Sequence, residues 1–199
     1  MLQRTKVRSE RDMKIAFIIF EGVTALDFIG TYDPISRLKT MGFMEEIEID
    51  ICSYQETVND FSSNIHFADL KVTQELSNYD MIIIPGGFGT RTLMNDESFL
   101  DWIKTSREDA VKASVCTGAL IWAAAGYLRG KHATTHFNSF DKIKDMGANV
   151  ETEKRVVVDG NIITARGVSA GIDLGLFICE KLMGKEVRDK IAKQMDYHY

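Results

Sequence analysis

The sequence predicts an α/β fold in which helices cover both faces of a mostly parallel sheet. Two short runs, residues 15–20 and 81–84, contain only apolar side chains. Uninterrupted apolarity of this length is typical of a parallel strand that is buried on both faces. Helical patterns separate these runs, and strands that alternate with helices indicate a parallel α/β sandwich.

The first half of the chain supplies most of the predicted sheet. Strands are expected at residues 14–20, 46–54, 81–85 and 112–115, with helices at residues 24–41 and 96–108. Within the first helix we expect a break, because Asp33 suits a new N-cap and Pro34 suits the first helical turn that follows it.

The second half predicts a hairpin and a helical tail. Residues 155–164 contain two β-forming runs around Asp159-Gly160, which suits a two-residue turn. Residues 169–197 follow a helical pattern that is interrupted near Gly184. Small residues at 165–173 open this tail, and we expect them to line a pocket or a dimer interface.

Composition restricts the class of protein. The 199 residues are 45% hydrophobic and 27% charged, which fits one soluble domain over residues 13–199 behind a disordered basic leader at residues 1–12. The net charge of −5 argues against a nucleic-acid partner, and no apolar run approaches the ~18 residues of a membrane span. Three widely spaced cysteines favour the reducing cytoplasm.

Cys116 is the leading candidate for a reactive group. The strand-like run V-K-A-S-V ends at this cysteine, and a helix-forming run begins shortly after it. Small residues at Ser114 and Gly118 permit a sharp nucleophile elbow, and a helix N-terminus favours a thiolate. The alternative is a buried core cysteine, which is the interpretation that suits Cys52 and Cys179.

A glycine pair follows the strand predicted at residues 81–85. Gly86 and Gly87 lack a Cβ, so their N–H groups can approach a ligand closely. They are candidates for one half of an oxyanion hole, with the N–H of Thr117 as the other half. A simple turn is the alternative, and the glycine spacing does not match a dinucleotide-binding motif.

Asp27 is the candidate acid or base. It follows the first strand and lies among Leu26, Phe28 and Ile29. Partial burial among such neighbours would raise its pKa and suit proton transfer. The alternative is an ordinary acidic residue in the first turn of a helix, where the helix dipole favours it.

Two histidines have the spacing H-x-x-x-H, but they do not predict a metal site. Ala133 stands where the zinc motif has glutamate, and the segment between His132 and His136 is strand-like rather than helical. We therefore expect no metal. For His136 two roles remain, as an imidazole in the substrate pocket or as a partner of the thiolate.

Five segments, taken in order, resemble the ThiJ/PfpI superfamily over residues 13–197: F-E-G-V-T-A-L-D-F-I-G, I-I-P-G-G-F-G-T, S-V-C-T-G-A-L, A-T-T-H-F and G-V-S-A-G-I-D-L. The resemblance implies a flavodoxin-like three-layer sandwich (class I glutamine amidotransferase-like) that forms a homodimer. It also implies a Cys116 nucleophile that is hydrogen-bonded to Asp27, with backbone donors at Gly87 and Thr117.

The chain also departs from the superfamily pattern in two places. It reads G-T-Y-D-P at residues 30–34, where relatives often have G-P-Y-E. Thr117 stands where the protease-like branch has histidine, which argues against peptidase activity.

Within the superfamily the chain is most similar to the isonitrile hydratases, which share C-T-G-A after the elbow strand and an aspartate at the acidic position. The resemblance implies that Cys116 attacks an isonitrile, that Asp27 delivers a proton and then helps to activate water, and that a formamide is released through a thioimidate. The Thr117 hydroxyl is implicated as well. No cofactor is needed for such chemistry. Phe28, Trp122 and Phe137 are expected to provide an apolar lining for the substrate.

Two other functions remain open. One is a glyoxalase or deglycase that acts on α-oxoaldehydes. The other is a redox sensor or stress-protective protein in which Cys116 cycles through sulfenic or sulfinic acid. In each case the expected partners are a small molecule and a second copy of the chain.

Overall fold

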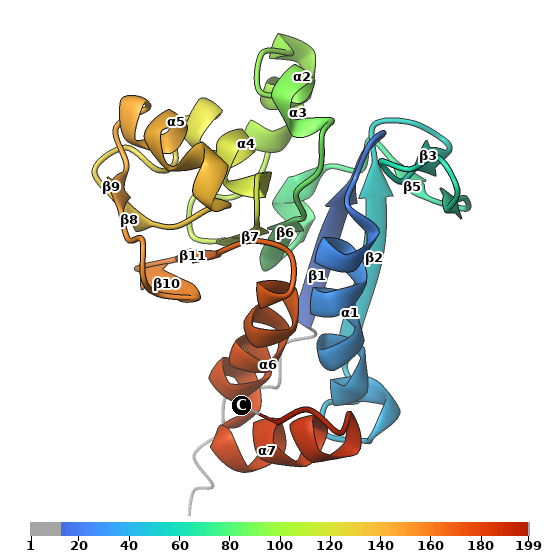
Figure 1. Ribbon diagram of the computed structural model, residues 1–199. Helices are drawn as coiled ribbons and strands as arrows, with labels where there is room; N and C mark the ends of the chain where they lie inside the picture. Colours follow the sequence, from blue (N-terminus) through green and yellow to red (C-terminus); the bar gives the residue numbers. More distant parts are fainter. Residues whose placement is uncertain (1–12, 199) are drawn as a thin grey trace, which may run out of the picture.

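The computed structural model describes residues 13–198, so the basic segment at residues 1–12 lies outside the described residues. A central sheet of seven strands has the order β10-β11-β7-β6-β1-β2-β5 (Figure 1). Its strands are β1 (Met13–Ile19), β2 (Ile47–Ser53), β5 (Lys71–Val72), β6 (Met81–Ile84), β7 (Val111–Val115), β10 (Val156–Asp159) and β11 (Ile162–Ala165). Two small two-stranded sheets pair β3 (Val58–Asn59) with β4 (His66–Phe67), and β8 (His132–Ala133) with β9 (Asn149–Val150).

The sheet is mostly parallel, as the apolar runs predicted. Only the edge pair of β10 and β11 is antiparallel within the seven strands. Every residue of β6 is buried, and so are Ile15 to Ile19 of β1. Because these central strands are covered on both faces, their side chains do not alternate between polar and apolar.

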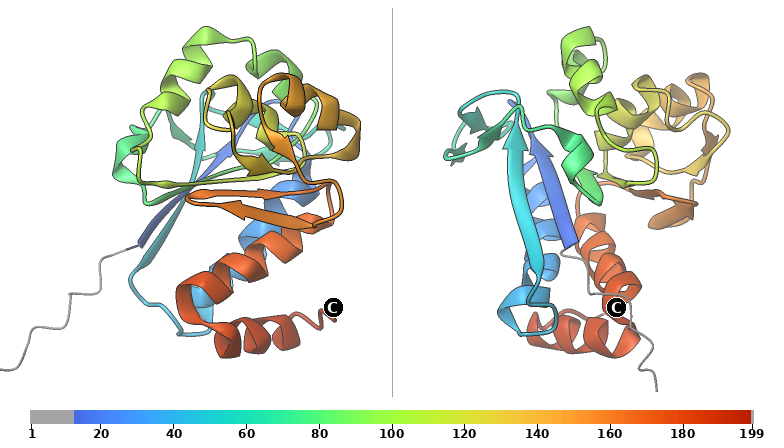
Figure 2. Two further views of the ribbon diagram at one scale, coloured as in Figure 1. Left: turned by 90° about the vertical axis from the view of Figure 1, so that its left-hand side faces the viewer. Right: turned by 180° about the vertical axis from the view of Figure 1, so that it is seen from behind.

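Helices form the two outer layers. Figure 2 shows α1 (Ala25–Thr40), α6 (Ala170–Met183) and α7 (Lys185–Gln194) on one side of the sheet, and the green and yellow helices on the other. That second layer contains α2 (Thr90–Leu93), α3 (Glu97–Lys104), α4 (Gly118–Ala124) and α5 (Phe140–Asp145). Short 3₁₀ turns lie at Leu76–Asn78 and Phe137–Ser139. This three-layer arrangement confirms the predicted sandwich, and the fold is flavodoxin-like.

The predicted break in the first helix is wrong. Helix α1 is continuous, with Pro34 inside it, and the Asp33 carboxylate pairs with Arg37 at 2.8 Å instead of capping a new helix. The Pro34 ring lies against Gly175 of α6, where an added Cβ would come within 2.8 Å of the ring. Packing against α6 therefore holds the helix together across a residue that disfavours helix interiors.

Two other local predictions need correction. The hairpin is present, but Asp159 pairs with Ile162, so its two-residue turn is Gly160-Asn161 rather than Asp159-Gly160. A glycine with φ of +64° at the first turn position suits a hairpin of this length. The strand expected between the histidines is limited to His132–Ala133. The break at Gly184 is confirmed, since this glycine separates α6 from α7 with φ of +84°.

The order of the strands in the sheet determines where the functional region lies. The chain passes from β1 to β2 in one direction across the sheet, and from β6 to β7 in the other. Such a reversal leaves a crevice beyond the carboxyl ends of the two central strands, which is where ligands bind in open α/β sheets. The first turn of α1 and the turns after β6 and β7 meet at this end, and they contain Asp27, Gly86 and Cys116.

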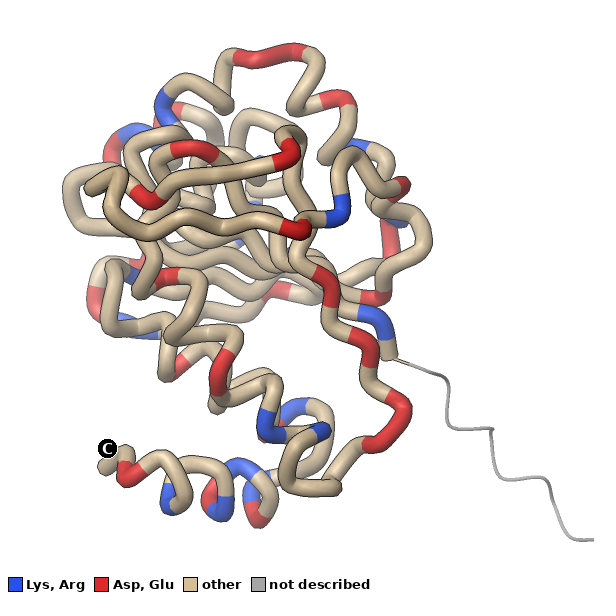
Figure 3. The backbone as a smooth tube through the Cα atoms, turned by 90° about the vertical axis from the view of Figure 1, so that its right-hand side faces the viewer, with Lys and Arg blue, Asp and Glu red and all other residues tan. Residues whose placement is uncertain are grey.

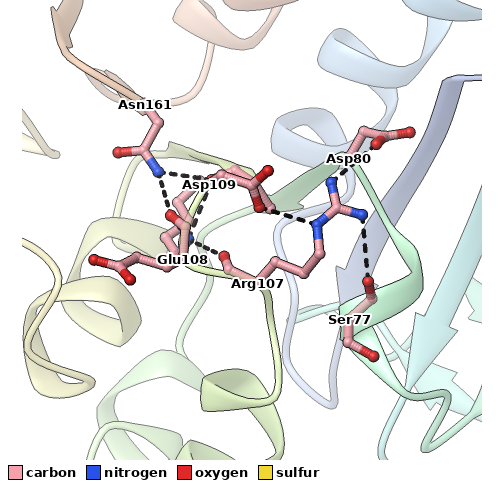
Figure 4. A network of polar contacts seen from close by, with 8 residues as sticks. Ser77, Asp80, Arg107, Glu108, Asp109 and Asn161 are labelled. Carbon is pink, nitrogen blue, oxygen red and sulfur yellow. Dashed lines mark hydrogen bonds and ion pairs between the residues drawn. The ribbon is translucent and has the colours of Figure 1, made fainter. Parts of the chain in front are cut away.

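The opposite end of the sheet is closed by a polar network. Figure 4 shows Arg107 between Asp80, Asp109 and Ser77, while Asn161 reaches the carbonyl of Glu108. Acidic and basic positions are interleaved along the described chain in Figure 3. Across residues 13–198, each helix is too short or too polar to span a bilayer.

Candidate active site

Cys116 lies on a strained turn between β7 and α4. Its φ of +55° falls in the left-handed region that residues with a side chain rarely adopt. The N–H of Cys116 donates to the carbonyls of Ala165 and Arg166 at 3.1 and 2.7 Å, and its carbonyl accepts from the Thr135 hydroxyl at 2.6 Å. At Gly118 a Cβ would lie 2.1 Å from the Ile84 carbonyl oxygen. The elbow predicted from small flanking residues is therefore present.

Asp27 lies in the first turn of α1, with its side chain fully buried. Its carboxyl is in hydrogen-bonding contact with the Cys116 thiol, and its Oδ2 accepts from the Gly86 N–H at 3.0 Å. The apolar neighbours noted in the sequence do not all bury it, since Leu26 and Ile29 are 49% and 45% exposed. The turns after β6 and β7 cover the carboxyl instead.

The glycine pair makes the close contact of Asp27 and Cys116 possible. A Cβ on Gly86 would lie 2.6 Å from Asp27 Oδ2 and 2.7 Å from the Cys116 Cβ. The N–H of Gly87 donates to the Thr117 hydroxyl at 3.0 Å, and that hydroxyl donates to the Gly87 carbonyl at 3.1 Å. Both glycine N–H groups thus have acceptors inside the protein and hold catalytic candidates in position.

The sulfur of Cys116 faces two backbone donors, the N–H groups of Thr117 and Val168, which favour its thiolate. Burial outweighs them, and with the nearby Asp27 charge it raises the pKa of the Cys116 thiol to about 12. Burial likewise raises the pKa of Asp27 to about 7, against the lowering effect of its bonds from Gly86 and Cys116. The resting pair therefore holds a thiol beside a carboxyl that titrates near neutral pH, rather than the thiolate that the helix terminus predicted.

A cavity of about 240 Å³ opens above the cysteine. Its lining residues come from all the converging turns: Thr24, Gly87, Phe88, Arg91, Cys116, Thr117, His136, Asn138 and Val168. The apolar lining expected from Phe28, Trp122 and Phe137 is wrong. The first two are core residues, and Phe137 is 60% exposed with its ring beside that of His136.

His136 lines this cavity but does not hydrogen-bond the thiol. Its Nδ1 accepts from the N–H of Asn138 at 3.3 Å, so the neutral ring carries its proton on Nε2. Burial, with the charges of Arg91 and Arg166, lowers the pKa of His136. His132 lies elsewhere and contacts Glu151 at 2.8 Å. Among residues 13–198, no cluster of three His, Cys, Asp or Glu side chains is arranged for a metal ion.

Sequence reasoning missed several members of the site. Arg91 and Asn138 line the cavity, Val168 contributes its N–H, and Thr135 bonds the elbow carbonyl. Arg91 had a signal, because this basic residue lies two positions after the last glycine of a glycine-rich turn at the carboxyl end of a strand. The loop at residues 165–173 was expected at a pocket or a dimer interface, and its Val168 lies at the pocket.

The site is thus a cysteine on a strand-to-helix elbow, paired with a buried acid, in an α/β protein of flavodoxin-like fold. The model of the DJ-1/PfpI family matches residues 13–181, and this chain belongs to that family. Isonitrile hydratase from Pseudomonas putida is 33% identical over 186 residues, which cover 93% of this chain and 78% of that protein.

Solved structures agree with this assignment. A ThiJ/PfpI family protein from Pseudomonas syringae has a TM-score of 0.83 at 28% identity, over 94% of this chain and 76% of that one. An oxidized DJ-1 from Toxoplasma gondii has a TM-score of 0.77 at 26% identity, over 94% of this chain and all of that one.

Proposed function

We propose that this protein hydrates isonitriles to N-substituted formamides, with Cys116 as its nucleophile. The observation that carries the proposal is the buried contact between the Asp27 carboxyl and the Cys116 thiol at the floor of an open cavity. The similarity to isonitrile hydratase over 93% of the chain supports the choice of substrate. The glutamate of most relatives is replaced here by the shorter Asp27, as the resemblance to the hydratases implies.

The first half of the reaction transfers one proton. The sulfur of Cys116 forms a bond to the terminal carbon of R–NC, while Asp27 accepts the thiol proton and delivers it to that carbon. The product is a thioimidate, R–N=CH–S–Cys116. A carboxyl whose pKa lies near 7 can perform both proton steps at neutral pH. The N–H groups of Thr117 and Val168 stabilise negative charge on the sulfur as the proton leaves.

The second half consumes water. Asp27 accepts a proton from a water molecule as its oxygen adds to the thioimidate carbon, and the carbon–sulfur bond then breaks. The nitrogen takes up the proton held by Asp27, the remaining hydroxyl proton passes to the leaving sulfur, and R–NH–CHO is released. Oδ1 of Asp27 is buried and receives no N–H or O–H donor among residues 13–198, so this oxygen keeps a free acceptor site for the proton that it takes up. Each half-reaction balances without a metal or an organic cofactor.

Formamide production from cyclohexyl isocyanide tests this proposal. We expect turnover by the unaltered protein, loss of turnover in Cys116→Ala and Asp27→Asn, and retained turnover in Cys52→Ala, which removes another buried thiol. Methylglyoxal consumption is measured in parallel. Consumption of methylglyoxal without isocyanide turnover would contradict the proposal and favour a glyoxalase.

A second candidate is a cysteine-based redox sensor or stress-protective protein, and the similarity to an oxidized DJ-1 structure favours it. Oxidation would add oxygen to the sulfur of Cys116, giving sulfenic and then sulfinic acid. Peptide mass spectrometry after graded peroxide treatment measures this change. Oxidation at Cys116 with no turnover of any electrophile would favour the sensor. Turnover of an electrophile at peroxide concentrations too low to oxidise Cys116 would exclude sensing as the main role.

We also propose that the protein acts as a homodimer in the cytoplasm. Exposed apolar side chains flank the site, with Leu26 and Ile29 on α1 and the rings of Phe61 and Phe88 in contact at 6.0 Å. A second copy is the proposed cover for this face. Sedimentation of the unaltered protein and of Leu26→Asp tests the interface, and a dimer that survives the substitution would place the interface elsewhere.

A further inference from the structure

The arginines of this chain fall into two groups. Seven lie within the described residues, and four of these form ion pairs with carboxylates: Arg37, Arg107, Arg155 and Arg188. The other three make no ion pair with a described carboxylate. Of these three, Arg91 lines the cavity above Cys116, and the charge of Arg166 reaches the cavity wall at His136.

Arg91 and Arg166 are both held against aromatic rings. The Arg91 guanidinium lies 4.9 Å from the centre of the Phe88 ring, and that of Arg166 lies 5.3 Å from the Phe140 ring. Arg91 itself lines the cavity, while the charges of both arginines reach His136 on the cavity wall. Stacking on a ring orients a guanidinium and leaves its N–H edge free for an anion.

The other residues of the cavity lining also suit an anionic ligand. None of its lining residues is acidic, and Asp27 lies behind the cysteine rather than in the lining. The neutral His136 ring presents an Nε2–H, and the Asn138 side chain adds an amide. The cavity volume of about 240 Å³ corresponds to roughly eight water molecules at ~30 Å³ each, which limits the ligand to a small molecule.

We propose that the substrate of this site is a small electrophile that bears a carboxylate, with Arg91 as the residue that binds this group. Arg166 adds a second positive charge, and the bound carboxylate directs the electrophilic carbon towards Cys116. This inference extends the proposed function by naming its substrate class. For an isonitrile hydratase the preferred substrate would be an isocyano acid, and a simple hydrophobic isocyanide such as cyclohexyl isocyanide would be turned over less efficiently.

The first experiment needs no enzyme activity. Iodoacetate and iodoacetamide are nearly the same size but differ in charge, and each alkylates a cysteine with loss of iodide. Rates of Cys116 alkylation are measured by peptide mass spectrometry, which separates this cysteine from the fully buried Cys52 and Cys179. We expect Arg91→Gln to lower the iodoacetate-to-iodoacetamide rate ratio by about 1.5-fold to fivefold, the range for one exposed charge pair.

Two control variants sharpen this measurement. Arg129→Gln removes the third unpaired arginine, which is exposed and is not part of the cavity lining, and it should leave the ratio unchanged. Arg91→Lys keeps the charge and should retain most of the ratio, which should also fall as salt is added. If neither Arg91→Gln nor Arg129→Gln changes the iodoacetate-to-iodoacetamide rate ratio, the proposal is overturned. Equal slowing of both reagents by Arg91→Gln would overturn it too, because this outcome indicates a structural role.

The second experiment compares isocyanoacetate with isocyanoacetamide as substrates. We expect a higher kcat/KM for the acid, and we expect Arg91→Gln to reduce this preference mainly through KM. Equal turnover of the two compounds would overturn the substrate assignment while leaving the hydratase intact. Turnover of neither would contradict the hydratase function, whereas the alkylation ratio would still report on carboxylate recognition.

Discussion

A buried ionisable side chain lies at each end of strand β7: Lys112 at the amino end, and Asp27, which comes from α1, at the carboxyl end. The two side chains differ in how many of their polar atoms have hydrogen-bond partners. At the amino end, the fully buried Lys112 donates from Nζ to three backbone carbonyls, those of Arg107, Glu108 and Ala110, at 2.7, 3.2 and 3.1 Å. The Tyr127 ring lies 4.7 Å away. The three hydrogens of the ammonium group thus all have acceptors.

At the carboxyl end, the hydrogen bonding of the buried side chain is incomplete. One oxygen of Asp27 receives no N–H or O–H donor among residues 13–198, and Cys116 occupies a strained backbone conformation. Burial lowers the pKa of Lys112 and raises that of Asp27, so at both ends it disfavours the charged form. Complete hydrogen bonding suits Lys112 to a structural role, whereas the incomplete set around Asp27 agrees with the proton exchange that we propose for it.

The largest expected effect is a stabilisation, and it comes from removing the Asp27 charge. The pKa of Asp27 is about 7 in the folded protein, against an ordinary value of 3.8. Between these values the folded state keeps a proton that the unfolded chain has released, so stability falls as pH rises through this interval. Asp27→Asn should therefore gain on the order of 4 kcal/mol relative to the unaltered protein between pH 4 and pH 8, at ~1.36 kcal/mol per pKa unit.

Urea unfolding at pH 4 and pH 8 measures this difference. The control is Asp101→Asn, which alters a surface carboxylate with an exposed side chain. A gain for Asp27→Asn that is the same at both pH values would show that Asp27 does not titrate in this interval, and it would remove the contrast with Lys112.

Gly86→Ala should have the next largest effect, on reactivity rather than on stability. The new methyl group would lie within 2.7 Å of both Asp27 and Cys116 and would force them apart. A displacement of this size costs about 100-fold in rates that depend on aligned groups. Alkylation of Cys116 and formamide production both measure the change.

Gly30→Ala is the matched control for this substitution. Gly30 also lies near Asp27 in the sequence, but its added Cβ would be at an ordinary distance of 3.5 Å from its neighbours. If the two variants reacted equally fast, contact between the acid and the thiol would not be needed for reactivity.

These contacts also explain which features the sequence could predict. Local signals were sufficient for the central strands and for the elbow, because an apolar run and small flanking residues act within a few positions of Cys116. Burial of Asp27 was predicted from its own neighbours, yet it depends on Gly86, which is 59 residues away. The prediction that Asp27 is buried is therefore confirmed, but the residues that bury it are not its sequence neighbours.

Other features depend on packing that no local pattern encodes. Pro34 remains helical because Gly175 of α6 receives its ring. The N–H of Val168 reaches the sulfur from a loop that follows β11, and Trp122 turns into the core, where it donates to the carbonyl of Ala113. An apolar side chain near a nucleophile therefore does not predict an apolar pocket, because its direction is decided by the layers around it.

The smallest expected effect tests the amino end of β7. Lys112→Met keeps an unbranched, apolar side chain of similar length but removes the donor to three carbonyls. Asn161 still donates to the carbonyls of Glu108 and Ala110, at 2.8 and 2.9 Å, and the Arg107 carbonyl still accepts from the Ala110 N–H at 3.3 Å, so each carbonyl loses one donor and keeps another. We expect a loss of about 1 kcal/mol, the net contribution of a typical hydrogen bond, because no carbonyl is left without a donor.

Urea unfolding of Lys112→Met at pH 7 measures this loss, with Lys104→Met as the control. Lys104 is half exposed and pairs only with Asp101 at the surface, so its replacement should change stability by less than about 0.5 kcal/mol. Alkylation of Cys116 should be the same in both variants, because the carboxyl end of β7 is held by other bonds. A stabilised Lys112→Met would mean that the buried ammonium is tolerated rather than required, as some buried ions are when an apolar group replaces them. In that case the two ends of the strand would share one property, a charge whose removal stabilises the fold.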